Sequence, residues 1–580
     1  MKSFFSKALN ELVFIWLVLA KFFGRLIRYF SAQERTAVLV FGSVLIVGLF
    51  ALGIDHYYAT TKIVPTSGGE LREGILGNVS YLNPILTADN SVARDITTLI
   101  YPSLMMYGTD GALHPDIVDT YTISVDHLTY SFTLKKNLRW QDGSPITADD
   151  VVYTLQLIQN PAVHSPLASL FSGVAAKVES PTSFTLTLPQ AYEPFLGNLT
   201  FGILPKHIWA NVDPKNIALS PNNLQPIGAG PYLFDSLQKD EQGQIQAIAV
   251  KRNSDYWGQA PYINKIAFYF YSSASALKQA LLSRSIDATM YLDANDAQGL
   301  EKAGFNEYLF KMPRYFAVFF NQKSLPGVLD DQNVRQALAE SIDKQAIIDS
   351  VFSGKGTAVY SPVPDQLLGY NPGAASYPFS LAHAQNILQQ NGWVKGTDGI
   401  LEKNTGSATV SLSFTLTTSN QQQLTDTANL LAAQWKKIGA DVHVTSDTAT
   451  DIENSILPNR NFQALLYGES LNIDPDPYSF WDSTQASSAG LNITDYTNST
   501  VDQALADARQ SFDQQQRAQD LVTFQSALTA DIPAIFLYNP NLLYIVRQNI
   551  GGIAAGLIPD PAGRFNGISS WYINTKRVAK

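Results

Sequence analysis

The sequence of 580 residues contains no cysteine. This absence excludes disulfide bonds, thiolate metal sites, cysteine nucleophiles and a lipid-modified N-terminal cysteine as a membrane tether. Charged residues are also few, at 16% of the chain, whereas apolar residues make up 45%, which is typical of an ordered globular protein. A chain of this length is too long for one hydrophobic core, so we expect two to four domains.

Sequence signatures of catalysis and metal binding are missing as well. The seven histidines are scattered, and none lies four residues from another. No G-x-S-x-G nucleophile motif occurs. The carboxylate pairs Asp149-Asp150 and Asp330-Asp331 stand where helices are expected to begin, which explains them without chemistry. We therefore predict that the protein is not an enzyme and that it holds neither a metal nor a cofactor.

The net charge of −10 is distributed unevenly. Residues 1–62 carry seven Lys and Arg against three Asp and Glu, so this head is basic and the remainder is strongly acidic. An acidic body disfavours a nucleic-acid partner. A basic head is typical of a segment that meets anionic lipid.

Residues 36–54 form a run of 19 residues without a charge. As a helix, the run would measure about 28 Å, which is roughly the thickness of the bilayer's hydrocarbon core. Basic residues precede it, so the positive-inside rule places the N-terminus in the cytoplasm and the chain after about residue 56 outside. No small-x-small cleavage site precedes the body, so we predict an uncleaved single-pass signal anchor and a cell-membrane location with an extracytoplasmic body.

The apolar stretch from Phe4 to Phe30 is interrupted by five charges. Its uninterrupted part, Leu12 to Ala20, is too short to span a bilayer, which favours a helix lying in the cytoplasmic interface. A second, tilted span is the alternative, and it would move the N-terminus outside.

The stretch from Trp140 to Asn160 combines a tight turn with a capped helix. Gly143 and Pro145 supply turn chemistry. Thr147 is the expected N-cap, and Asp150 stands three residues on, where its carboxylate can reach back to the cap amide.

Residues 142–154, DGSPITADDVVYT, resemble the DG-x-P-[LVI]-TA-x-DV-x-Y-[ST] run of the family 5 solute-binding proteins of ABC importers, which include peptide and nickel binders. Other pieces resemble that family in the same order along the chain. They are Leu82-Asn83-Pro84, Pro205-Lys206-His207, Gly228 to Tyr232 (GAGPY), Arg252 to Gly258 (RNSDYWG), Phe320-Asn321, and Pro475-Asp476-Pro477.

The resemblance implies an α/β, class II periplasmic-binding-protein-like fold of two lobes with an extra small domain, preceded here by the N-terminal transmembrane helix. Alternating strands and helices favour largely parallel pairing in the lobes. The expected divisions are 1–35 cytoplasmic or interfacial amphipathic segment, 36–55 transmembrane anchor, 56–69 tether, 70–107 lobe I (first part), 108–200 small domain II, 201–290 lobe I (second part), 291–530 lobe III, and 531–580 return to lobe I.

The resemblance also implies that a peptide binds between two hinged lobes. The family's amine-binding Asp falls at Ile473 and the next residue, a Tyr in the family, at Asp474, so either Asp474 takes over the role or the ligand has no amino terminus there. The family's cleft tyrosine falls at Leu167. The expected ligand-binding residues are Ala88, Asp89, Asn90, Leu167, Tyr315, Phe316, Ile473, Asp474, Asp476, Tyr478 and Trp481, of which the aromatic ones could instead pack in the core.

The implied function is capture of oligopeptides outside the cytoplasm and their delivery to ABC permease subunits, with the lipid bilayer as a further partner. A ligand sensor or adaptor with the same trap is the first alternative. Binding of a sugar or a nickel chelate is the second. A cell-wall peptide hydrolase is the third, and the missing nucleophile motif argues against it.

Overall fold

The computed structural model describes residues 30–87, 90–374, 376–406, 408–487 and 490–580. Its contacts divide the chain into a small unit, which runs to Thr66 and includes Asn574–Lys580, and a large unit, Ser67–Ile573. Apart from Phe30, the stretch expected to lie in the membrane interface falls outside the described residues.

The described part of the small unit contains one long apolar helix, α2 (Ala32–Thr60). It begins at a capping box in which Ser31 and Glu34 bond reciprocally, and none of its residues is buried. The helix is long and apolar enough to cross a membrane. It runs further than predicted, and β1 (Thr61–Thr66) follows at once and pairs antiparallel with β24 (Asn574–Ala579), so residues 56–69 are not an irregular tether.

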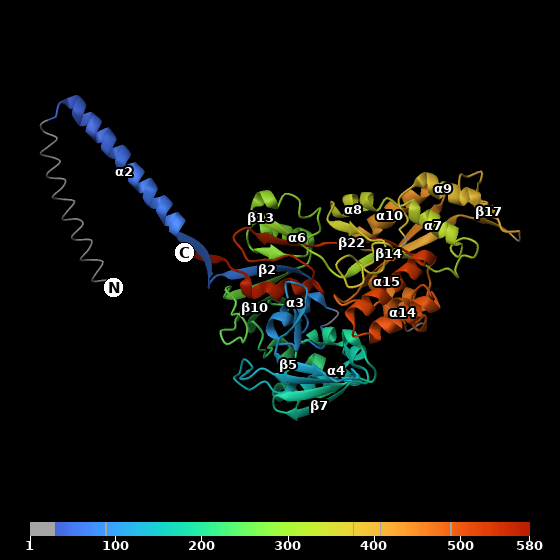
Figure 1. Ribbon diagram of the computed structural model, residues 1–580, viewed down its shortest axis with the longest axis horizontal. Helices are drawn as coiled ribbons and strands as arrows, with labels where there is room; N and C mark the ends of the chain where they lie inside the picture. Colours follow the sequence, from blue (N-terminus) through green and yellow to red (C-terminus); the bar gives the residue numbers. More distant parts are fainter. Residues whose placement is uncertain (1–29, 88–89, 375, 407, 488–489) are drawn as a thin grey trace. The chain divides into compact units, whose positions relative to one another are not determined.

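Lobe I of the large unit is built on a seven-stranded sheet (Figure 1). The helices α3 (Ser91–Ile100) and α6 (Ala274–Leu282) belong to this lobe. Its strand order is β13 (Phe305–Phe310), β23 (Leu542–Arg547), β12 (Ala288–Thr289), β2 (Glu70–Leu76), β11 (Lys265–Tyr271), β10 (Ile245–Arg252) and β9 (Tyr232–Lys239).

Lobe III is built on a six-stranded sheet with a hydrophobic core on each face. In Figure 1, α8 (Lys344–Phe352) and α10 (Gln422–Lys436) lie on one side of it, and α14 (Ser499–Gln510) and α15 (Gln514–Asp531) lie on the other. Its strand order is β15 (Gly356–Ala358), β22 (Ala534–Pro540), β14 (Arg314–Phe320), β21 (Ala464–Ser470), β19 (Ser413–Ser419) and β20 (Asp441–Asp447).

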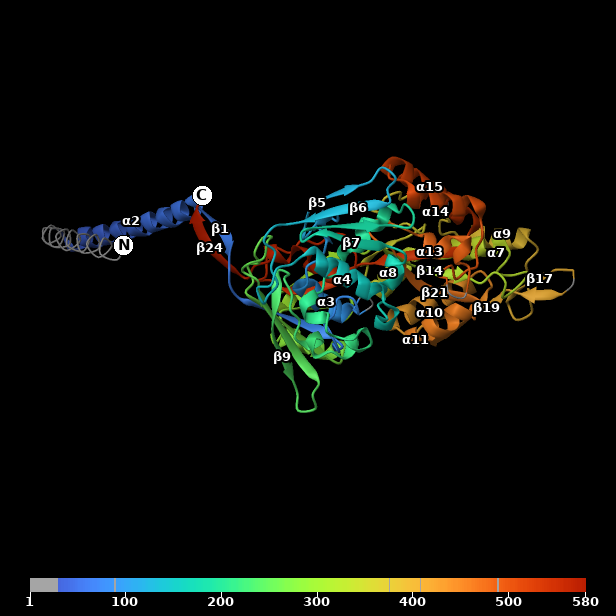
Figure 2. The same ribbon diagram turned by 90° about the horizontal axis from the view of Figure 1, so that it is seen from below.

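Domain II is a four-stranded antiparallel sheet, covered by α4 (Ala148–Gln159). Its strands, in order, are β5 (Val118–Ile123), β6 (Thr129–Leu134), β8 (Ser183–Thr187) and β7 (Ala175–Ser180). The predicted start of α4 is confirmed, because the carboxylate of Asp150 accepts a hydrogen bond of 2.8 Å from the amide of Thr147. Figure 2 shows β5 and β6 approaching α14 and α15, and His127, in the turn between those strands, stacks on Phe512 of lobe III at 3.8 Å.

Shorter elements complete the large unit. The helices are α5 (Lys206–Trp209), α7 (Gln332–Glu340), α9 (Leu381–Gln390), α11 (Ala449–Asp451), α12 (Leu457–Asn459) and α13 (Tyr478–Trp481), with the 3-10 segments η3 (Ala168–Phe171), η4 (Glu193–Thr200) and η10 (Pro561–Ser570). The strands are β3 (Met105–Tyr107) paired with β4 (Leu113–Pro115), and the hairpin sheet of β16 (Val394–Lys395), β17 (Leu401–Asn404) and β18 (Thr409–Ser411).

The expectation of largely parallel sheets is wrong. Parallel pairs occur at β2 with β11 and β12, and at β19 with β20 and β21, whereas the other pairs in both sheets are antiparallel. Antiparallel pairing follows where short connections join neighbouring strands, as between β9 and β10.

The chain crosses between the lobes at two places that differ from the expected boundaries. It leaves the lobe I sheet after β13, at Phe310, rather than near residue 291. Strand β22, expected in the segment that returns to lobe I, pairs with β14 in lobe III, and the return comes between Pro540 and Leu542. Both crossings therefore connect the two sheets directly, strand to strand.

Candidate functional site

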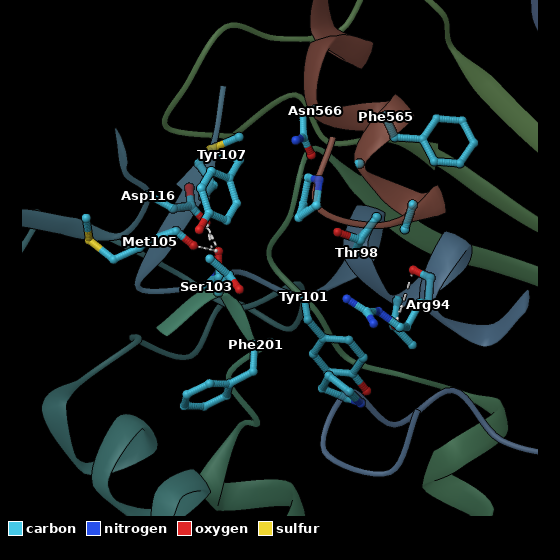
Figure 3. A pocket seen from close by; sticks show the side chains of 18 of the residues that line it. Arg94, Thr98, Tyr101, Ser103, Met105, Tyr107, Asp116, Phe201, Phe565 and Asn566 are labelled. Carbon is cyan, nitrogen blue, oxygen red and sulfur yellow. Dashed lines mark hydrogen bonds between the residues drawn. The ribbon is translucent and has the colours of Figure 1, made fainter. Parts of the chain in front are cut away.

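A cavity of about 770 Å³ lies among lobe I, domain II and one loop of lobe III. Its walls come from α3, β3, η3, η10, the end of η4 with the residues after it (197–202) and the loop 256–259. Figure 3 shows Tyr107 and Ser103 on one side, Thr98 and Arg94 on the other, and Asn566 between them.

The helix α3 presents a polar edge to this cavity because its apolar face is buried in lobe I. Ile96 and Leu99 lie in the core, and Arg94 and Thr98 line the cavity. Asn90, which we expected to bind ligand, caps this helix by accepting a 3.0 Å hydrogen bond from the amide of Ala93.

The two carboxylates that line the cavity among the described residues are engaged by the protein. Asp116 accepts hydrogen bonds from the amide of Ser103 at 2.9 Å and from Nε1 of Trp257 at 3.0 Å. Burial nevertheless raises the pKa of Asp116. Asp560 caps η10 and pairs with Arg94. Neither carboxylate is therefore left without a partner that a ligand would have to supply.

The polar groups of the wall that are available to a ligand are uncharged. Nδ2 of Asn566 and Oγ1 of Thr87 are buried and have no hydrogen-bond partner among the described residues. Burial, with Asp474 nearby, raises the pKa of Tyr107 to about 12, so its hydroxyl stays protonated and can donate. Because an unpaired buried polar group is costly, these groups favour a ligand that carries carbonyl or hydroxyl oxygens.

A buried ion cluster joins the two main walls beneath the cavity. Arg564 of η10 donates from Nη1 and Nη2 to Asp95 of α3, at 2.7 and 2.8 Å, and from Nη2 to Glu73 of β2 at 3.0 Å. All three side chains are fully buried. Burial raises the pKa of Glu73 to about 7, against the opposing effect of Arg564. The cluster holds η10 against α3 and so fixes the position of the cavity wall.

Most of the expected ligand-binding residues that the structure describes do not line the cavity. Leu167 does line it. Ile473 does not, although its neighbour Asn472 does. The expected residues Ala88 and Asp89 fall outside the described residues.

The expected acidic residues of lobe III are engaged by arginines. Asp474 forms an ion pair with Arg517, and Asp476 lies 3.1 Å from Nε of Arg509. The guanidinium of Arg509 also covers the ring of Tyr478 at 4.2 Å. Arg517 also pairs with Glu193 of domain II, so the acidic loop lies at the contact between lobe III and that domain.

Three of the expected aromatic residues of lobe III pack in or against the hydrophobic cores and do not line the cavity as expected. Tyr315 and Trp481 are buried in the core on one face of the sheet, where Nε1 of Trp481 donates to the hydroxyl of Tyr315 at 3.2 Å and that hydroxyl donates to Glu469. Phe316 packs against the other core and stacks on Tyr538 at 5.4 Å. Alternation along β14 sends these rings to opposite faces of the sheet, and none lines the cavity.

The sequence did not point to Tyr107, Asp116 or Asn566 as wall residues. The RNSDYWG motif contains Trp257, whose Nε1 donates to Asp116. The motif was therefore the available sequence signal for this part of the wall, although it does not reveal that Asp116 is the partner. Asn566 lies in the 3-10 segment η10, where the sequence showed no motif or periodic pattern that we had singled out. Among the described residues no group of three His, Cys, Asp or Glu is arranged to hold a metal ion.

Comparisons with known proteins agree with this architecture. The profile of the bacterial extracellular solute-binding proteins, family 5 (middle), matches residues 112–492. The oligopeptide-binding protein AppA of Bacillus subtilis is 27% identical over 542 residues, covering 90% of this chain and 96% of that protein. The dipeptide-binding protein of Escherichia coli is 24% identical, covering 84% and 92%.

Solved structures show the same fold. The substrate-binding protein CtaP of Listeria monocytogenes, 25% identical, superposes with a TM-score of 0.75 and covers 87% of this chain and 99% of that one. AppA of Bacillus subtilis in complex with a nonapeptide, also 25% identical, has a TM-score of 0.69 and covers 88% and 100%. The predicted family and the two-lobed α/β fold are confirmed.

Proposed function

This chain belongs to family 5 of the bacterial extracellular solute-binding proteins, and we propose that it captures peptides outside the cytoplasm and delivers them to an ABC permease. The family carries solutes and is not an enzyme family. Relatives named for oligopeptide and dipeptide binding support a peptide as the solute.

The observation that carries the proposal is the cavity of about 770 Å³, which lies within the size range of small-ligand sites. The Asn566 amide, which has no partner among the described residues, and the Tyr107 hydroxyl, which stays protonated, suit the carbonyl oxygens of a peptide backbone. Backbone recognition of this kind gives affinity without selecting particular side chains.

The direct test is to identify what the protein carries. The full-length chain is purified in detergent, denatured, and the released solutes are analysed by mass spectrometry. Isothermal titration with a mixed peptide pool follows. We expect peptides in the released fraction and heat in the titration. A released sugar or nickel chelate, with no heat from peptides, would contradict the peptide proposal and identify the solute.

We further propose that α2 spans the membrane as a single-pass anchor. Its length and apolar surface support this. Replacing Leu45 at the middle of the helix with Arg should cost about 2.5–3.5 kcal/mol of insertion free energy and shift the chain out of the carbonate-resistant membrane fraction. Leu45→Ala is the matched control. Equal retention of Leu45→Arg and Leu45→Ala would contradict the anchor.

A further inference from the structure

Besides the stacking of His127 on Phe512, domain II contacts lobe III through two adjacent residues at the start of η4. Glu193 lies 3.0 Å from Nη1 of Arg517 in α15, which also pairs with Asp474. Beside it, the hydroxyl of Tyr192 donates to Asp476 at 2.9 Å, and the guanidinium of Arg509 lies 5.0 Å from the Tyr192 ring. We call these six residues, 192, 193, 474, 476, 509 and 517, the lobe contact.

The lobe contact lies next to the proposed ligand cavity. Asn472, two residues before Asp474, is the one described cavity-lining residue that lobe III supplies. At the other end, Gly197 and Asn198 of η4 also line the cavity. The lobe contact therefore joins the loop that contains Asn472 to η4, and both of these segments line the cavity.

The charges in the lobe contact do not balance locally. Two carboxylates, Glu193 and Asp474, share the single guanidinium of Arg517, which is 2% exposed and also donates to the carbonyls of Ala508 and Pro475. Oε2 of Glu193, the same atom that lies 3.0 Å from Nη1 of Arg517, is buried and meets that guanidinium as an ion pair without a hydrogen bond from the described residues. Because the two carboxylates lie close together and share one cation, it is energetically unfavourable for both to be negatively charged.

We propose that Glu193 and Arg517 are positioning residues that hold lobe III over the ligand cavity, and that forming the lobe contact takes up a proton on the Glu193–Asp474 pair. The inference rests on the proposed function, because it describes how the same cavity is closed. It makes ligand retention stronger in acidic surroundings and release easier in alkaline ones.

The environment of Glu193 explains why its pKa is raised when the lobe contact forms. Burial first, and the charge of Asp474 second, raise the pKa of Glu193 to about 7, while Arg517 opposes them. The hydroxyls of Tyr130 and Tyr107 also face this pair of acids. His127, which stacks on Phe512, is a further titratable group of the interface.

The pH dependence of closure has the direction expected for a carboxyl group whose pKa is raised in the closed state. With the lobes apart, Glu193 is in water and keeps its ordinary pKa near 4.5. The closed state then gains from protonation below pH 7, and the gain is lost as the pH rises through about 7. One such proton corresponds to an affinity that is about tenfold weaker at pH 8 than at pH 6.

The experiment measures the affinity of the full-length protein for the peptide pool at pH 6 and pH 8. Glu193→Gln keeps the shape of the protonated acid and needs no proton to close, so it should bind at least as tightly as the unmodified protein does at pH 6 and lose the tenfold difference. Asp474→Asn should weaken the pH dependence, since it removes the second cause that raises the pKa of Glu193 and leaves burial, opposed by Arg517. Glu179→Gln, at a more exposed glutamate of domain II, is the matched control and should behave as the unmodified protein.

A second readout needs no ligand. Because the chain has no cysteine, Thr182→Cys in domain II and Gln503→Cys in lobe III give a single dye pair whose distance reports closure. We expect closure to be favoured at pH 6 and this dependence to disappear with Glu193→Gln. A pH dependence of closure that persists in Glu193→Gln and Asp474→Asn overturns the inference. Absence of peptide binding at every pH, with closure still dependent on Glu193, overturns the proposed function alone.

Discussion

Replacing Arg564 with Leu should strongly destabilise lobe I. The guanidinium is fully buried and donates three hydrogen bonds of 2.7–3.0 Å to Asp95 and Glu73. The substitution leaves two buried carboxylates without their cation. Breaking a buried ion pair from one side costs about 3–5 kcal/mol. We expect a loss of this size in the free energy of unfolding of lobe I.

The loss of unfolding free energy in Arg564→Leu should depend on pH. The pKa of Glu73 is already raised to about 7 by burial, and removing Arg564 takes away the opposing effect that lowers it. For a raised carboxyl pKa, the stability contribution is present at low pH and is lost as the pH rises through the folded-state value. Arg564→Leu should therefore be less damaging at pH 6 than at pH 8.

Hydrogen exchange followed by mass spectrometry isolates lobe I in this test, through peptides that cover β2 and β23. Arg139→Leu, at an exposed arginine of domain II, is the control and should change stability by less than about 0.5 kcal/mol. Adding Glu73→Gln to Arg564→Leu removes one unpaired charge and should restore part of the protection. Ligand affinity should fall with Arg564→Leu, because η10 and α3 both wall the cavity. Unchanged protection of β2 and β23 would refute the reasoning.

Two further substitutions test the site and its support. Asn566→Ala removes the open amide of the cavity wall and should weaken peptide binding by about 0.5–1.5 kcal/mol, roughly two- to tenfold, in a calorimetric titration, whereas exposed Asn216→Ala should not. Gly228→Ala would place a Cβ 2.1 Å from the carbonyl oxygen of Ile100 at the end of α3, so it should lower stability by at least about 2 kcal/mol in thermal unfolding. Gly556→Ala, where the nearest atom is 3.4 Å away, is its control, and equal melting temperatures for the two would contradict the steric argument.

The elements that depend on neighbouring residues could be predicted from the sequence. The cap of α4 rests on Thr147 and Asp150, three positions apart, and the structure has that bond. The uncharged run at 36–54 lies inside α2. Tyr130 and Phe132, alternating with polar residues, lie on the buried face of β6. Such patterns are encoded within one or two turns or strands, so no knowledge of distant partners is needed.

The direction of strand pairing and the contents of the cavity were decided by tertiary structure. Tyr315 and Trp481 were candidates for the cleft because aromatic rings suit a core and a cleft equally well, and their burial depends on which helices cover β14. The cavity instead brings together Tyr107 and Asn566, which are more than 450 positions apart. Likewise, Glu193 and Arg517 meet only after domain II has folded against lobe III. Local periodicity fixes which face of an element is apolar, but the partner that covers it, and the groups that meet at the edge, are chosen by the packing of the whole chain.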